Sequence, residues 1–121
     1  MKILAIETSC DETSLSLFMA TETASGVDFD VDSTITQSQI DIHQEFGGVF
    51  PALAKREHQK NLVPILLKIL NQEAAENPEI TSNSEIETIL ERESELLESF
   101  IKYVMPIQNP GINAICVTSG P

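Results

Sequence analysis

The chain has 121 residues, 41% of them hydrophobic, and a formal net charge of −12 from 19 acidic and 7 basic residues. This length allows one modest hydrophobic core, so we expect a single compact unit and not two domains. The apolar content excludes a wholly disordered chain. The charge has the wrong sign for a protein that binds nucleic acid through its own surface, so any RNA must be held by another surface.

The sequence carries no signal for a membrane or for export. No apolar run approaches the length needed to span a bilayer, and the N-terminus lacks the apolar core and cleavage site of a secretory signal. The two cysteines, Cys10 and Cys116, lie far apart in the sequence. We therefore expect a cytoplasmic protein with reduced thiols and no membrane partner.

Three strands are predicted at the start of the chain. Residues 2–7 contain a run of apolar residues before a turn, and residues 14–19 alternate between polar and apolar. The short gap between them predicts an antiparallel hairpin. Residues 27–32 alternate apolar residues with aspartates, which predicts a third strand with one face in solvent, near a sheet edge.

Helices and a fourth strand are predicted next. Pro51 suits the first turn of a helix whose apolar stripe runs to Leu70, and Pro64 predicts a kink or break near residues 60–63. Residues 73–109 are predicted as an acidic insert that holds nine of the 19 acidic residues. A polar linker there leads to one amphipathic helix from about Ser84, which we expect to dock on the sheet. Residues 112–117 form a short apolar strand.

This order of elements favours an α/β fold with a mixed sheet. Three strands, a crossover helix and a fourth strand resemble the start of the lobe shared by actin, the heat-shock chaperones and the sugar kinases. The similarity concerns the order of elements alone and carries no information about chemistry.

Three blocks resemble the TsaD family, the tRNA threonylcarbamoyladenosine synthases once called Gcp glycoproteases. The first is "ILAIETSCDETS" at residues 3–14, and the last is "INAICVTSGP" at residues 112–121. Between them, "SQIDIHQEFGGVFPALAKREHQKNLVP" at residues 38–64 is similar to the family's Ser-Gln, His, Gly-Gly-Val, Pro and Arg-x-His pattern. The Cys-Asp-Glu-Thr sequence favours the catalytic member over its paralogue TsaB.

The resemblance implies that residues 1–121 are the N-terminal part of the first actin-like lobe (ASKHA, ribonuclease H-like) of a longer enzyme. It implies transfer of a threonylcarbamoyl group from threonylcarbamoyl-AMP to the adenosine amine beside the tRNA anticodon. It also implies one iron or zinc ion, whose His-Met-Glu-Gly-His ligands are not in this chain, and TsaB-like and TsaE-like or KEOPS partners. The 121 residues alone are expected to be inactive, and the insert at 73–109 departs from the family.

The loop of the first hairpin is the leading candidate for a binding site. Hydroxyl groups and free backbone N–H groups hold phosphates or carboxylates, and Ser9, Cys10 and Thr13 are our substrate-binding candidates there. Ser119 and Gly120 are predicted to form a second anion-holding turn. On the sequence alone, a binding site and a purely structural turn are equally open for this loop.

Glu7, Asp11 and Glu12 place three carboxylates at the same loop. Two unit charges about 4 Å apart repel by roughly 4 kcal/mol at an effective dielectric of 20, so all three are not expected to face a substrate phosphate. Asp11 or Glu12 is the candidate catalytic base that accepts a proton from the adenosine amine. The alternative is that both acids cap backbone N–H groups or pair with a lysine.

Neither the thiols nor the histidines suggest a site of their own. The acids around Cys10 disfavour a thiolate, so a packed or inert thiol is expected. His43 and His58 lack the spacing of three or four that places two metal ligands on one helix face, so no metal ligand is predicted. Arg56 and His58 are interpreted as solvated helix positions.

Two other functions remain open on the sequence. One is a non-catalytic, TsaB-like module that binds a partner through the helix from Pro51. The other is an actin-like lobe of a small-molecule kinase, although Glu7-Thr8-Ser9 replaces the aspartate and glycines usual in the first turn of such kinases. A metalloprotease gains no support.

Overall fold

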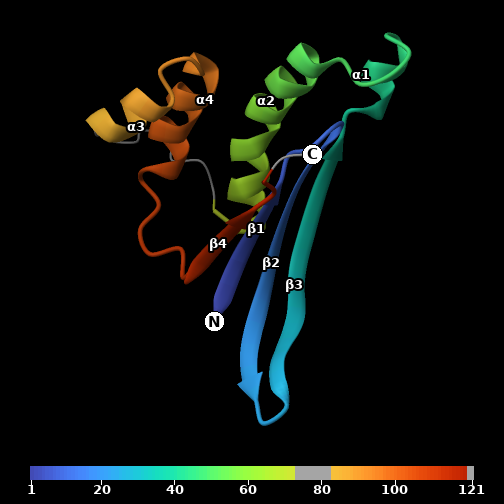
Figure 1. Ribbon diagram of the computed structural model, residues 1–121. Helices are drawn as coiled ribbons and strands as arrows, with labels where there is room; N and C mark the ends of the chain where they lie inside the picture. Colours follow the sequence, from blue (N-terminus) through green and yellow to red (C-terminus); the bar gives the residue numbers. More distant parts are fainter. Residues whose placement is uncertain (73–82, 120–121) are drawn as a thin grey trace.

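The computed structural model describes residues 1–72 and 83–119 (Figure 1). The described residues contain a mixed four-stranded sheet of order β3-β2-β1-β4. Its strands are β1 (Lys2–Glu7), β2 (Glu12–Thr23), β3 (Gly26–Ser38) and β4 (Ala114–Val117). β2 pairs antiparallel with β1 and β3, and β4 lies parallel to β1. The α/β class, the mixed sheet, the opening hairpin and the edge position of β3 are confirmed.

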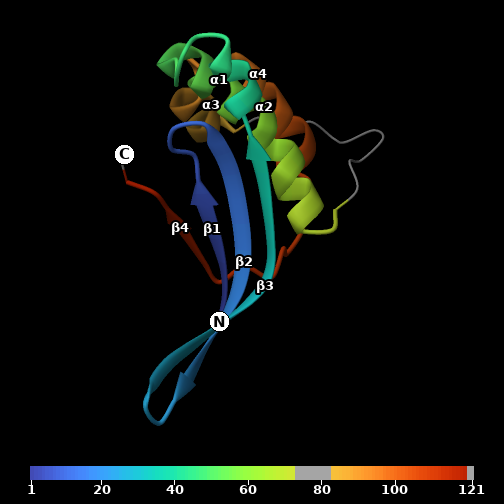
Figure 2. The same ribbon diagram turned by 90° about the vertical axis from the view of Figure 1, so that its right-hand side faces the viewer.

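The β2–β3 hairpin is longer than predicted and projects past the rest of the molecule (Figures 1 and 2). The apolar residues Val27, Phe29 and Val31 are exposed along with the aspartates between them. The expectation that only one face of this segment meets solvent is therefore wrong. The physical reason is that the segment extends beyond the reach of the helix that covers the sheet, so alternation of polar and apolar residues has no core to face.

One long helix covers one face of the sheet. α2 (Pro51–Ile69) begins with Pro51 at its N-terminus, as predicted, and follows a short helix, α1 (Ile40–Gln44). α2 continues through Pro64, so the expected break near residues 60–63 is wrong. Pro64 is exposed whereas Val63 and Ile65 are buried, so packing of the neighbours holds the helix together despite the lost N–H.

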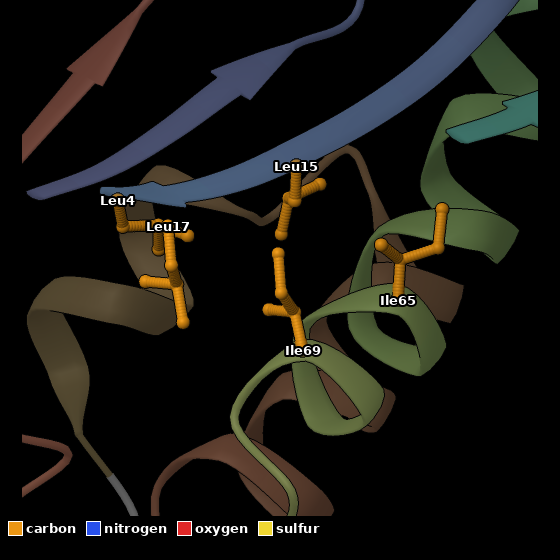
Figure 3. Close-up of a cluster of buried hydrophobic side chains, with 5 residues drawn as sticks. All are labelled: Leu4, Leu15, Leu17, Ile65 and Ile69. Atoms are coloured by element: carbon orange, nitrogen blue, oxygen red, sulfur yellow. The ribbon is translucent and has the colours of Figure 1, made fainter. Parts of the chain in front are cut away.

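The core lies between this helix and the first two strands. Figure 3 shows Leu4, Leu15 and Leu17 of the sheet pointing toward Ile65 and Ile69 of α2. Strand residues at every second position and helix residues four apart face the same space, which is the pattern of a sheet covered by an amphipathic helix. The other face of β2 and β3 carries exposed hydroxyl pairs, Ser14 with Thr36 and Ser16 with Thr34, each 2.8 Å apart.

The region after residue 82 departs from the predicted single helix. It forms α3 (Ser84–Ile89), α4 (Ser94–Ser99) and a π-helical segment, η1 (Phe100–Val104). Asn83 caps α3 by accepting from the N–H groups of Glu85 and Ile86, and a turn in which Glu93 N–H donates to Leu90 O separates α3 from α4. α4 and η1 pack chiefly on α2, not on the sheet as expected. Residues 73–82 of the predicted insert lie outside the described residues.

Within residues 1–72 and 83–119, no helix combines the length and the apolar character needed to cross a bilayer.

Candidate functional site

The tip of the first hairpin is organised by Glu7. The Glu7 carboxylate accepts hydrogen bonds from the Ser9 backbone N–H at 2.8 Å and from the Ser9 hydroxyl. The Ser9 hydroxyl, the Ser9 N–H and then the Thr118 hydroxyl lower the pKa of Glu7, against the opposing effect of partial burial. Cys10 adopts a left-handed backbone conformation, φ 54°, which reverses the chain. One of the three carboxylates thus binds its own loop, as the charge argument required.

A cavity of about 630 Å³ opens between this tip and α2. Its walls combine hydroxyl, amide and imidazole groups with apolar side chains. The lining residues are Thr8, Ser9, Cys10, Val49, Pro51, Ala54, Lys55, His58, Gln59, Leu62, Leu96 and Thr118. The hairpin tip is therefore the rim of a cavity and not a bend buried within the sheet.

Buried polar side chains form a hydrogen-bonded network next to the cavity. Thr13 Oγ1 lies 2.8 Å from His58 Nδ1, and Gln39 Nε2 lies 3.1 Å from the same nitrogen. Gln39 Oε1 lies 3.1 Å from His43 Nε2, and the Phe50 N–H donates to His43 Nδ1 at 3.3 Å. The side chains of Thr13, Gln39 and His43 are fully or almost fully buried. The network joins β2, the end of β3, α1 and α2.

The acidic region supplies another wall. Leu96 of α4 lines the cavity, and Glu93, which precedes α4, pairs with Lys55 of α2 at 2.5 Å and accepts from Gln59. The Lys55 ammonium, above all through its hydrogen bond, lowers the pKa of the Glu93 carboxyl. Two polar side chains of the cavity are therefore already engaged by Glu93.

The structure brings only some of the predicted site residues to the cavity. Ser9 and Cys10 line it, and Thr13 lies behind it in the buried network. Asp11 and Glu12 belong to the same hairpin but are absent from the cavity walls, and their catalytic role stays a prediction. Of the two alternatives for Cys10, a packed thiol is wrong, because Cys10 is exposed at the left-handed turn, and an inert thiol stays a prediction.

The second predicted turn is described only in part. Thr118 donates its N–H to Ile6 O at 3.2 Å and lines the cavity, and Ser119 is exposed. Gly120 lies outside the described residues. Thr118 also lines a smaller cavity of about 230 Å³ beside Glu7, Ser14 and Ser16.

His58 is the main residue that sequence reasoning misjudged. Its interpretation as a solvated helix position is wrong, because its ring is half-buried and hydrogen-bonded to Thr13 and Gln39. The sequence held one signal, that Thr13 lies on the same strand face as the buried residues Leu15 and Leu17. Such a polar residue needs a partner, but the sequence does not say which one.

The described residues offer no fit for a metal ion. Within 1–72 and 83–119, no group of three or more His, Cys, Asp or Glu side chains is placed to hold one. The iron or zinc ion implied by the family resemblance therefore has no ligands on the described surface, and no chemistry is assigned to it here.

The structure is that of an α/β protein whose first hairpin borders a cavity of about 630 Å³. Residues 30–82 match the family model "TsaD: tRNA N6-adenosine threonylcarbamoyltransferase". A "tRNA N6-adenosine threonylcarbamoyltransferase" of Persephonella marina is 46% identical over 72 residues, which are 60% of this chain and 19% of that protein. A protein of the same name from Mesomycoplasma hyopneumoniae strain 7448 is 44% identical over 72 residues, 60% of this chain and 20% of that protein.

These matches confirm the resemblance to the TsaD family that the sequence motifs indicated. The matched segment spans about a fifth of the length of these curated relatives.

Proposed function

We propose that the chain is the N-terminal part of a cytoplasmic tRNA-modifying transferase of the TsaD type. In this proposal residues 1–121 belong to the first actin-like (ASKHA) lobe, and residues 73–109 are an insert in it. The single observation that carries the proposal is that the hairpin tip, where the Cys-Asp-Glu-Thr motif lies, borders the cavity of about 630 Å³. The names of the matched relatives support the reaction class.

The cavity has the chemical character that an acyl-adenylate requires. The Thr8 hydroxyl offers a donor to phosphate oxygens, and Val49 and Leu62 offer apolar surface to a base or sugar. β4 leaves Ile115 and Val117 exposed by 62% and 65%, which supports a lobe that is completed by further parts of a longer protein.

The proposed substrate is threonylcarbamoyl-AMP, and the acceptor is the amine of the adenosine beside the anticodon. The amine nitrogen forms a bond to the carbamoyl carbon, the bond from that carbon to the phosphate oxygen breaks, and AMP leaves with the electron pair. One amine proton passes to a carboxylate, for which we propose Asp11 or Glu12, since Glu7 is engaged with Ser9. Ser9, Cys10 and Thr13 belong to the substrate-binding side, with Ser119 and Gly120 as the second turn.

The proposed partners follow from the charge and from the family. With a net charge of −12 the chain does not supply a phosphate-binding surface for tRNA, so the tRNA is held in the full complex. TsaB-like and TsaE-like or KEOPS subunits are the proposed components of that complex, and the proposed iron or zinc ion is bound outside this chain.

Protection of Cys10 tests whether a nucleotide enters the cavity. In the Cys116→Ser chain, AMP is expected to slow the reaction of Cys10 with a maleimide by at least severalfold, because Cys10 lines the cavity. The control is the Cys10→Ser chain, in which labelling of Cys116 is expected to be insensitive to AMP. An AMP effect on neither cysteine, or an equal effect on both, contradicts the proposal.

Activity of the full-length gene product tests the carboxylates. With its partner subunits and threonylcarbamoyl-AMP present, replacing the general base by Asp11→Asn or Glu12→Gln is expected to lower the rate of tRNA modification by about 100-fold or more. Glu22→Gln, in the projecting hairpin, is the matched control. Unchanged rates for both Asp11→Asn and Glu12→Gln would remove these residues from the reaction.

A further inference from the structure

We propose that His58 binds the phosphoryl group of the adenylate by donating its Nε2–H, and that Gln39 and His43 are positioning residues that hold His58 in this tautomer. The assignment of the ligand rests on the proposed function. The assignment of the tautomer rests on the buried hydrogen bonds alone.

The direction of the hydrogen bonds is set by a backbone group. The Phe50 N–H can only donate, so His43 Nδ1 is an acceptor and a neutral His43 carries its proton on Nε2. His43 Nε2–H then donates to Gln39 Oε1 at 3.1 Å, which fixes the orientation of the Gln39 amide. The amide NH₂ is left to face His58 Nδ1 at 3.1 Å. His58 Nδ1 is thus an acceptor, and the proton of neutral His58 lies on Nε2.

Burial makes this direction costly to reverse. Gln39 and His43 are 1% and 2% exposed, and Thr13, whose hydroxyl lies 2.8 Å from His58 Nδ1, is 0% exposed. Turning the Gln39 amide over would set its NH₂ against the Nε2–H of His43, so that two buried donors would face each other. The Thr13 hydroxyl can rotate, so with Nδ1 as the acceptor it donates to the same nitrogen as the amide.

The other ring nitrogen of His58 is open to the cavity. No hydrogen bond joins Nε2 to another group in residues 1–72 or 83–119, and the half-buried ring lines the cavity wall. The neighbouring polar side chains on α2, Lys55 and Gln59, are occupied by Glu93. His58 is therefore a cavity-lining donor of α2 that a ligand meets without first breaking a hydrogen bond among the described residues. The Thr8 hydroxyl lines the same cavity and supplies a second donor for a phosphoryl oxygen, whereas the Ser9 hydroxyl is given to Glu7.

Nitrogen NMR of the histidine rings tests the tautomer directly. Long-range ¹H–¹⁵N correlation spectra of the labelled chain at about pH 8, where an ordinary histidine is neutral, are expected to show both histidines protonated on Nε2 only. Gln39→Glu replaces the NH₂ donor with an acceptor in the same shape, so His58 Nδ1 is expected to gain a proton. Gln44→Glu, exposed on α1, adds the same charge as a control and is expected to leave both rings unchanged.

His43 variants test the positioning role. His43→Gln keeps an amide N–H for Gln39 Oε1, so His58 is expected to keep its single tautomer. His43→Leu removes that donor and frees the Gln39 amide, so a mixture of His58 tautomers is expected. Amide spectra establish which variants remain folded, and the isosteric Gln39→Glu chain provides the test if His43→Leu does not fold. A native His58 protonated on Nδ1, or a folded His43→Leu chain with an unchanged His58, would overturn the proposal.

Addition of AMP tests the donor role, with adenosine as the control that lacks a phosphate. AMP is expected to shift the His58 Nε2 and its proton, and adenosine is not. If AMP protects Cys10 but leaves His58 Nε2 in place, the donor role is wrong while the proposed function stands. If AMP does neither, the proposed function fails and the donor role fails with it, whatever the tautomer.

Discussion

The backbone N–H of Gln39 donates to the carbonyl oxygen of Asp11 at 2.7 Å and so ties the tip of the first hairpin to the end of β3. The side chain of the same Gln39 contacts both His58 and His43. One residue that follows β3 therefore fixes both the loop on one side of the cavity and the imidazole on the other. The two walls are mechanically linked, and changes to the buried network are expected to alter the loop.

The buried hydroxyl of Thr13 is predicted to contribute to stability. Thr13→Val keeps the shape of the side chain but removes its hydrogen bond to His58, so the free energy of unfolding in urea is expected to fall by about 1 to 2 kcal/mol. Thr36→Val, which removes an exposed hydroxyl pair with Ser14, is the control and is expected to change it by less than about 0.5 kcal/mol. Equal effects of the two substitutions would contradict the structural role of Thr13.

The Glu7 carboxylate is predicted to give pH-dependent stability. Its hydrogen bonds with Ser9 lower its pKa in the folded chain below the ordinary value of 4.5. A lowered folded pKa means that the stabilisation is complete above the unfolded pKa and is lost as the pH falls through the folded value. Glu7→Gln is therefore expected to destabilise the chain at neutral pH, and the difference from wild type is expected to shrink below pH 4.5.

Urea titrations of both chains across this pH range measure the effect of Glu7. The exposed hairpin variant Glu22→Gln controls for the change in net charge. A difference between wild type and Glu7→Gln that grows as the pH falls would refute the assignment.

The contact of α2 with the sheet is predicted to supply much of the stability. Ile69 is buried against the leucines of β1 and β2, so Ile69→Ala leaves a cavity and is expected to cost about 2 to 5 kcal/mol, measured by urea or thermal unfolding. Ile89→Ala, at a side chain that is 70% exposed on α3, is the matched control and is expected to cost little. A small loss at Ile69 would mean that α2 is not docked as described.

The contact of Glu93 with Lys55 and Gln59 is predicted to hold the acidic region on α2. Glu93→Gln removes the charge that pairs with Lys55, so backbone hydrogen exchange within residues 94–104 is expected to become faster by a fewfold. High salt is expected to have a similar but smaller effect on the wild-type chain. Glu95→Gln, exposed in the first turn of α4, is the control. No change in exchange for Glu93→Gln would show that apolar packing alone, including Leu96, holds this region.

Local pattern was enough to predict the elements that face a core. The alternation around Leu15 and Leu17 and the stripe that includes Ile65 and Ile69 predicted β2 and α2, because burial of one face imposes its period on the sequence. The same rule failed at Val27 to Val31, where the period is present but the core is not. A different rule, that proline breaks a helix, failed at Pro64, through which α2 continues.

Sequence reasoning pointed to the hairpin loop at the cavity but not to the buried polar residues that lie next to it. Ser9 and Cys10, which line the cavity, were selected because hydroxyls follow a strand at a chain reversal and because they lie in the family's motif, and their role in binding stays a prediction. His58, Gln39 and His43 were missed because each is an ordinary polar residue in its own segment, and only their mutual contacts give them a role.

The sequence by itself determined the α/β class, the opening hairpin, the covering helix and the kinship with the TsaD family, since these depend on local periodicity and on contiguous motifs. Only the tertiary structure decided that one hydrogen-bonded network beside the cavity joins Thr13, Gln39, His43 and His58. It also decided that Glu93 forms an ion pair with Lys55 of the cavity wall. The reason is physical: a buried polar group requires a partner, but which partner it finds depends on the packing of distant segments, and no local pattern encodes that choice.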